Sequence, residues 1–141
     1  MAADRKLELL SKVRMFSSLN RKELRLIART SDVIQVPKGT EIVTEGKLGH
    51  EFYLILSGSA SVRRGGRKVA SLSTGDYFGE MALLDKGPRT ASIVAEEDCE
   101  LLLLGQREFM SVLDQVPPVA HKLLVNMASR LREADSRAVS H

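Results

Sequence analysis

Apolar residues near the start of the chain recur at the spacing of a helix. Leu7, Leu10 and Val13 lie three positions apart, which predicts one helix over this stretch. A second helix is predicted over residues 21–29, where a capping-box pattern marks the first turn. We therefore expect two short helices within residues 4–30.

From residue 31 to residue 104 the pattern changes to short apolar runs separated by glycines. Turn signals recur about every eight to twelve residues, which is typical of a β-sandwich or barrel and leaves no room for helical crossovers. A glycine pair, Gly65-Gly66, suits a two-residue hairpin turn. The predicted strands cover residues 33–36, 41–44, 52–56, 60–64, 68–72, 91–95 and 100–104.

After Gly105 the helical period returns. Phe109 and Val112 lie on one face of a short helix that stops near a proline pair, and a longer helix is predicted over 118–137. The fold class is therefore α+β, a jelly-roll-like β-barrel or sandwich flanked by N-terminal and C-terminal helices. We expect a single domain over residues 1–141, with helices in 4–30, a β-roll over 31–104 and C-terminal helices over 105–137.

The positive charge does not predict a nucleic-acid-binding surface. The chain carries a net charge of +3, with basic and acidic residues interleaved along its length. The densest basic cluster, Arg63, Arg64, Arg67 and Lys68, surrounds the glycine pair. We interpret this cluster as the solvated tip of a hairpin.

The single cysteine, Cys99, is interpreted as a small buried or half-buried residue without a disulfide partner. No apolar run approaches the roughly 18 residues that a membrane span needs. The chain opens with charged residues rather than with the apolar core of a signal peptide. These features predict a cytoplasmic location and no membrane partner.

Catalysis is not expected. A metal-dependent barrel enzyme needs clustered ligands, whereas His50, His121 and His141 are isolated in the sequence. A nucleophile elbow of the Gly-x-Ser-x-Gly type is absent, and Cys99 has no histidine near it in the chain. The sequence therefore predicts a non-enzyme without a metal or cofactor.

Residues 78–92 interrupt the strand pattern and carry the candidate chemistry. A helical turn is predicted after Phe78, and its free amides together with Gly79 suit a phosphate. Arg89 follows a proline and can hold two phosphate oxygens at once. Glu80, which only accepts hydrogen bonds when ionised, suits the hydroxyls of a sugar. Together these residues describe a site for a sugar phosphate.

Glu80 and Arg89 alone would also fit an ordinary surface pair. The whole string over 78–92, however, resembles the phosphate-binding cassette of the cyclic-nucleotide-binding family. This family includes bacterial catabolite activators, cyclic-nucleotide-dependent kinases and nucleotide-gated channels. Residues 37–46 and 52–58 are similar to its first barrel strands.

The resemblance implies a role for each residue of the site. Glu80 and the Gly79 backbone would hold the ribose 2′-hydroxyl, and Arg89 would hold the exocyclic phosphate oxygens. The final helix would add Arg130 as a further contact to the ligand. The amides of Ala82, Thr90 and Ala91 would complete the phosphate cradle, and Val43, Val62, Val69 and Met81 would supply apolar walls. Plain core packing is an equally good interpretation of Val43.

The resemblance leaves the base open. Thr90 lies where cyclic-GMP-dependent kinases contact the guanine amino group, but family members that respond to cyclic AMP also carry threonine there. Where catabolite activators use hydroxyl residues against adenine, this chain has Ala134 and Asp135. Cyclic AMP is the favoured ligand, and cyclic GMP is the alternative.

The expected role is that of a sensor that repositions its C-terminal helices when it binds its ligand. It would signal in this way to an effector protein that the sequence does not identify. Dimerisation through the final helix and a longer parent protein are both open alternatives. Direct DNA binding is not expected, because His141 ends the chain before any helix-turn-helix. A third class is a degenerate module that binds no nucleotide and acts in protein interaction.

Overall fold

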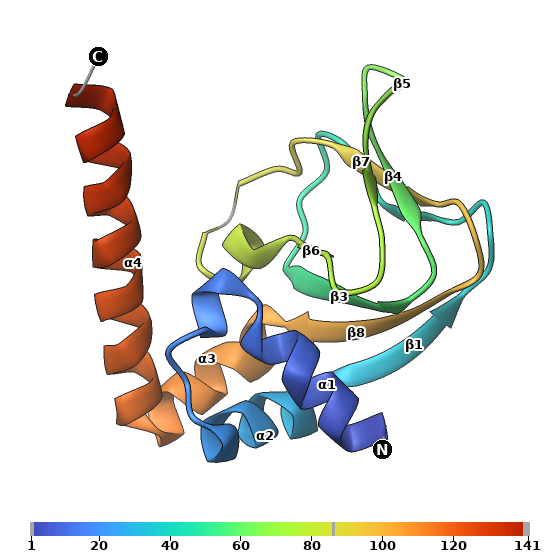
Figure 1. Ribbon diagram of the computed structural model, residues 1–141. Helices are drawn as coiled ribbons and strands as arrows, with labels where there is room; N and C mark the ends of the chain where they lie inside the picture. Colours follow the sequence, from blue (N-terminus) through green and yellow to red (C-terminus); the bar gives the residue numbers. More distant parts are fainter. Residues whose placement is uncertain (1, 86, 140–141) are drawn as a thin grey trace.

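The computed structural model describes residues 2–85 and 87–139. Two four-stranded antiparallel sheets, ordered β1-β8-β3-β6 and β2-β7-β4-β5, form the barrel. Figure 1 shows α1, α2 and α3 gathered on one side of this barrel, with α4 standing beside it. The helical segments are α1 Ala2–Ser11, η1 Arg14–Phe16, α2 Arg21–Thr30, η2 Glu80–Leu83, α3 Gln106–Gln115 and α4 Pro117–Val139. The strands are β1 Asp32–Val36, β2 Glu41–Val43, β3 Glu51–Ser57, β4 Ala60–Arg64, β5 Arg67–Leu72, β6 Tyr77–Phe78, β7 Ser92–Ala95 and β8 Cys99–Gly105.

The expected α+β jelly-roll fold is confirmed, and the seven predicted strands differ from the observed ones by at most one residue at either end. The strand β6 was not predicted. It is two residues long and pairs Tyr77 with Leu54 and Phe78 with Tyr53. A strand of two residues is too short to show an alternating pattern in the sequence. It forms only because it pairs with β3.

Strand β3 is buried on both faces and joins two parts of the core. Phe52 and Leu54 belong to a cluster with the helices, whereas Tyr53 and Ile55 belong to a cluster inside the barrel. This division follows the two-residue period of a strand. The helical cluster is centred on aromatic rings, with ring centroids 5.7 Å apart for Phe16 and Phe52.

Two local predictions are confirmed by backbone geometry. At the start of α2, Asn20 Oδ1 accepts from the Glu23 amide at 2.9 Å, and Glu23 Oε1 accepts from the Asn20 amide at 2.9 Å. This is the expected capping box. In the β4–β5 hairpin, Gly65 and Gly66 have φ values of +57° and +79°, as a two-residue turn requires.

Helix α4 is held to the N-terminal helices by polar contacts. Lys122 Nζ donates to Glu23 Oε1 at 2.7 Å, and Asn126 Nδ2 donates to the Arg14 carbonyl at 3.1 Å and to Ser17 Oγ at 3.2 Å. Burial by itself would raise the pKa of Glu23, but the bonds from Lys122 and from the Asn20 amide lower it. These contacts fix α4 beside the barrel (Figure 1).

The outer face of α4 is partly apolar. Leu124 and Leu131 are 68% and 65% exposed, and they lie seven residues apart on one helix. Within the described residues no helix is both long and apolar enough to cross a membrane.

Candidate functional site

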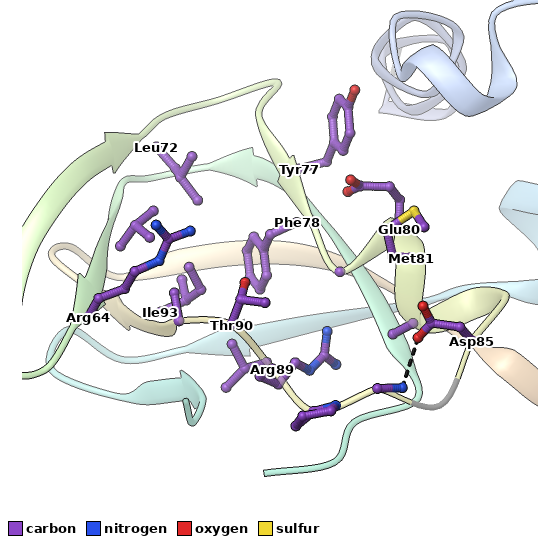
Figure 2. Close-up of a pocket in the computed structure, with 17 residues that line it drawn as sticks. Arg64, Leu72, Tyr77, Phe78, Glu80, Met81, Asp85, Arg89, Thr90 and Ile93 are labelled. Atoms are coloured by element: carbon purple, nitrogen blue, oxygen red, sulfur yellow. Dashed lines mark hydrogen bonds between the residues drawn. The ribbon is translucent and has the colours of Figure 1, made fainter. Parts of the chain in front are cut away.

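A hollow of about 590 Å³ lies between η2, the loop after it and the second sheet (Figure 2). Its volume falls in the range of roughly 300 to 1,000 Å³ that is common for small-molecule sites. The walls combine apolar residues of the sheet with polar residues of segment 78–92. The lining residues are Val43, Val62, Arg64, Leu72, Tyr77, Phe78, Gly79, Glu80, Met81, Ala82, Asp85, Gly87, Pro88, Arg89, Thr90, Ala91 and Ile93.

Arg89 is anchored to the floor of this pocket by its backbone. Its amide donates to the Lys47 carbonyl at 2.8 Å, and its carbonyl accepts from the Gly46 amide at 2.8 Å. The side chain is only 9% exposed, and its Nη2 donates to the Glu51 carbonyl at 2.8 Å. The Glu51 carboxylate lies 3.5 Å from the same nitrogen. The backbone bonds of Arg89 and its contacts with Glu51 therefore fix the position of the guanidinium.

The guanidinium of Arg89 has an unused donor. Its Nε is buried and has no hydrogen-bond partner among the described residues. A buried donor without a partner costs on the order of 1 to 3 kcal/mol, so such groups call for a ligand or water. An anion with more than one acceptor oxygen would satisfy it.

Two glycines make room for the Arg89 side chain. A Cβ on Gly49 would lie 2.2 Å from Arg89 Nε, and a Cβ on Gly79 would lie 2.5 Å from Nη1 and 2.6 Å from the Glu51 carbonyl oxygen. Gly79 also has a φ of +81°, which side-chain-bearing residues rarely adopt. The structure therefore requires glycine at position 79 for space and for conformation.

Glu80 and Arg89 both line the pocket, but they do not form the surface pair that was the plain alternative. Among the described residues, the ion-pair partner of Arg89 is Glu51. In Figure 2, Glu80 lies with Tyr77 and Met81 at one side of the pocket, apart from the guanidinium. The carboxylate of Glu80 is therefore placed to contact a different part of a ligand from the part that Arg89 contacts.

The remaining residues of the predicted cradle lie around the same hollow. Ala91 is buried, Met81 is 51% exposed, and Thr90 is exposed at the mouth. The amide of Ala82 already donates to the Gly79 carbonyl at 3.0 Å within η2. A ligand would have to share that amide or displace this bond.

The apolar wall differs in part from the expectation. Val43 and Val62 line the pocket, and Val43 also belongs to the barrel core. Val69 is 54% exposed on β5 and lies outside the lining, where Leu72 of the same strand takes part. Arg130 lies on α4, also outside the lining. The ligand contacts of Val69 and Arg130 stay predictions.

Sequence reasoning missed the residues that support Arg89. Glu51 opens the apolar strand β3, and an acid at that position was the available signal. Arg64 and Leu72 were also missed as site residues, and only the folded chain brings them to the pocket. Gly49, which lies against the Arg89 side chain, was missed as well.

Other titratable groups near the barrel do not form a metal centre. Within the described residues no group of three His, Cys, Asp or Glu side chains is arranged to hold a metal, and His141 lies outside them. Burial raises the pKa of the Cys99 thiol, whose Sγ contacts the Ser59 carbonyl at 3.3 Å. Burial and the negative charge of Glu51 raise the pKa of Tyr53, whereas the charge of Arg89 acts in the opposite direction.

Comparison with known proteins identifies the family. The family model of the cyclic nucleotide-binding domain matches residues 33–116, which contain the barrel and its pocket. The chain therefore belongs to the cyclic nucleotide-binding domain family. This family is a regulatory module that binds rather than catalyses.

Individual relatives agree with this assignment. The chain is 46% identical over 104 residues to the cyclic AMP receptor protein of Thermus thermophilus, a match over 70% of this chain and 48% of the relative. It superimposes with a TM-score of 0.86 and 27% identity on the N-terminal domain of a transcriptional regulator from Streptomyces coelicolor, over 92% of this chain and 94% of that one. It is also similar to the regulatory domain of Toxoplasma gondii PKA with cAMP, with a TM-score of 0.73 and 28% identity, over 78% of this chain and 44% of that one.

The similarity is to one part of longer proteins. The chain spans about half the length of the receptor protein that it matches, 48%. The matched region contains the pocket and the barrel.

Proposed function

We propose that this chain is a cyclic-nucleotide sensor that binds cyclic AMP in the pocket around Arg89. Binding, rather than catalysis, is its function, and no metal or cofactor takes part. The ligand places its cyclic phosphate on Arg89 and its ribose hydroxyl on Glu80, while the apolar wall receives the base. A cytoplasmic location remains a prediction from the sequence.

One observation carries this proposal. The Arg89 side chain is 9% exposed, yet its Nε has no partner among the described residues and the guanidinium faces a pocket. A structural arginine at such depth would have its donors satisfied. A phosphate with two free oxygens fits the vacant donor and the planar geometry of the group.

Two relatives support adenine as the base of the ligand, and so cyclic AMP. The Thermus thermophilus protein is named as a cyclic AMP receptor, and the Toxoplasma gondii domain was solved with cAMP. Cyclic GMP is the alternative, because Thr90 at the pocket mouth has a hydroxyl that the guanine amino group can contact.

The signal would pass through the C-terminal helices. Gln106, the first residue of α3, donates through Nε2 to the Ala82 carbonyl at 3.1 Å, and its amide donates to the His50 carbonyl at 2.7 Å. A phosphate that moves η2 therefore pulls on α3 directly. We propose that α4 then leaves Arg14 and Ser17 and closes over the pocket, which brings Arg130 toward the ligand.

The output partner is a separate effector protein, and the exposed face of α4 with Leu124 and Leu131 also suits a second copy of the chain. Light scattering with and without cyclic AMP tests the dimer. A doubling of mass supports it, and an unchanged monomer mass contradicts it.

A titration of the chain with cyclic AMP, cyclic GMP and linear 5′-AMP tests the proposed function. We expect saturable heat with cyclic AMP and weaker binding of the linear nucleotide, whose phosphate carries more charge but is not held in the ring geometry. Absence of binding to both cyclic nucleotides would support the degenerate interaction module instead.

A further inference from the structure

Tyr77 connects the wall of the pocket to the N-terminal helices. It is the first residue of β6 and lines the pocket, and its Oη accepts from the Arg14 amide at 3.3 Å. Figure 2 shows Tyr77 beside Glu80, with its hydroxyl pointing away from Arg89. Arg14 is the first residue of η1, and the amides of a first helical turn have no partner within the helix. The Tyr77 hydroxyl therefore supplies an acceptor that η1 lacks.

Arg14 also carries α4. Its carbonyl accepts from Asn126 Nδ2 at 3.1 Å, and its Nη2 pairs with Glu133 Oε2 at 3.2 Å. Both side chains of that ion pair are more than half exposed, so the pair contributes little, and the bond from Asn126 is the firmer attachment. One residue thus binds the pocket wall through its amide and α4 through its carbonyl.

The bond between Tyr77 and Arg14 cannot survive a movement of η2. Met15 and Phe16 are 1% and 0% exposed, so η1 is fixed in the core. Strand β6 runs through Gly79 directly into η2, so a movement of η2 displaces Tyr77 relative to η1. Because the bond is already 3.3 Å long, a displacement of about half an ångström would end it.

We propose that Tyr77, Arg14 and Asn126 form a latch that holds η2 and α4 in their open arrangement, the one in which Arg130 lies outside the pocket lining. Tyr77 is a positioning residue in this latch, because it acts through Arg14 on α4. The inference rests on the proposed function, since the ligand opens the latch by moving η2. Opening it lowers the affinity for the ligand in proportion to the stability of the open arrangement.

Two phenylalanine variants test the latch. Tyr77→Phe removes the hydroxyl and keeps the ring, whose centroid lies 6.0 Å from that of Phe52. Tyr53→Phe is the matched control, because Tyr53 is the other tyrosine of the chain and its hydroxyl bonds to no residue that the structure describes. Calorimetric titration with cyclic AMP measures the affinity. Spin labels at Ser129→Cys on α4 and Ser71→Cys on β5, both exposed positions, measure the place of α4.

We expect Tyr77→Phe to bind cyclic AMP about two- to tenfold more tightly than wild type, the scale of one hydrogen bond between neutral groups. Its label distance without nucleotide should also shift toward the shorter value of the saturated protein. Tyr53→Phe should match wild type in both measurements. A Tyr77→Phe affinity that equals that of wild type or falls below it would overturn the inference.

A double-mutant cycle with Asn126→Ala tests whether the two bonds of Arg14 act together. Asn126→Ala should also tighten cyclic AMP binding, and the double variant should gain no more than the larger single gain, because either change opens the same latch. Gains that multiply would show two separate restraints and would overturn the latch.

The wild-type chain separates failure of the latch from failure of the proposed function. Wild-type chain that binds neither cyclic AMP nor cyclic GMP fails the proposed function, and the inference with it. Wild-type chain that binds cyclic AMP with no change in label distance overturns the latch, while nucleotide binding at Arg89 stands.

Discussion

The guanidinium of Arg89 donates to the backbone carbonyl of Glu51 at 2.8 Å, so the arginine of the pocket is aligned by main chain. The carboxylate of Glu51 reinforces this contact from 3.5 Å. Because β3 is buried on both faces, that carbonyl cannot shift without disturbing the core. The position of Arg89 is thus a property of the barrel and does not depend on the ligand.

Gly79→Ala should remove binding by displacing Arg89. The added methyl would collide with Nη1 of Arg89 and with the Glu51 carbonyl oxygen, so we expect cyclic AMP to bind about tenfold weaker or worse. Gly66→Ala is the matched control, because Gly66 has a similar φ of +79° with no atom near the new methyl. Both variants should lose about 1 to 2 kcal/mol of unfolding free energy from the left-handed backbone. Gly79→Ala should lose more than Gly66→Ala, because its methyl also collides with the Glu51 carbonyl oxygen. Equal binding by both variants in calorimetry would contradict the role of Gly79.

Glu80→Ala should abolish discrimination at the ribose 2′-hydroxyl. Wild-type chain is expected to bind 2′-deoxy cyclic AMP about tenfold more weakly than cyclic AMP, the scale of one hydrogen bond to a charged group. The variant should bind the two nucleotides with equal affinity, because the acceptor is gone. Competition titrations of both nucleotides against both proteins measure this difference. A variant that discriminates as wild type does would place the ribose elsewhere.

Much of the fold follows from local sequence, and the reasons are visible at particular residues. The Gly65-Gly66 pair accepts positive φ at both positions, so the hairpin could be predicted without its partner strands. The Asn20 and Glu23 capping box is similarly local. The strand β6 at Tyr77 is not local, since it depends on pairing with β3.

The residues of the site also divide into those that the local sequence predicts and those that only the fold brings together. Glu80 and Arg89 could be found because they lie in one continuous string, whereas Glu51 reaches Arg89 from 38 residues away. On β5 the expectation for Val69 depended on the register. A bulge separates the pairs Val62–Ala70 and Arg63–Lys68, and the two-residue period then puts Leu72 on the pocket side.

Cyclic AMP should draw the end of α4 toward the barrel. Spin labels at Ser129→Cys on α4 and Ser71→Cys on β5 would report this motion, because both native side chains are exposed. Cys99 is buried in the barrel, and burial also raises the pKa of its thiol, so we expect the label to react at the two exposed positions instead. We expect a shorter mean distance with ligand. A distance distribution that stays unchanged in the saturated protein would contradict the closure.

Lys122→Met should change how the stability of the fold depends on pH. The pKa of Glu23 is lowered below its ordinary value in the folded chain, so its contribution to stability is present above the pKa of the unfolded chain and is lost as pH falls through the folded pKa. Without Lys122, burial raises the pKa of Glu23 and only the bond from the Asn20 amide still lowers it, so this acid-dependent loss shrinks. Thermal unfolding between about pH 3 and pH 7, the window of a carboxyl group, should therefore show a flatter curve for the variant. Parallel curves would show that the bond to Lys122 does not set the pKa of Glu23.

The central claim is that Arg89 holds the phosphate of a cyclic nucleotide, and Arg89→Lys tests it most directly. Lysine keeps the charge but cannot donate in the planar two-point geometry, so we expect cyclic AMP affinity to fall by about 1.5 to 3 kcal/mol. Arg67→Lys, an exposed substitution in the hairpin outside the pocket lining, is the control and should bind as wild type does. Calorimetric titration of the three proteins with cyclic AMP gives the answer. An Arg89→Lys affinity equal to that of wild type would contradict the account.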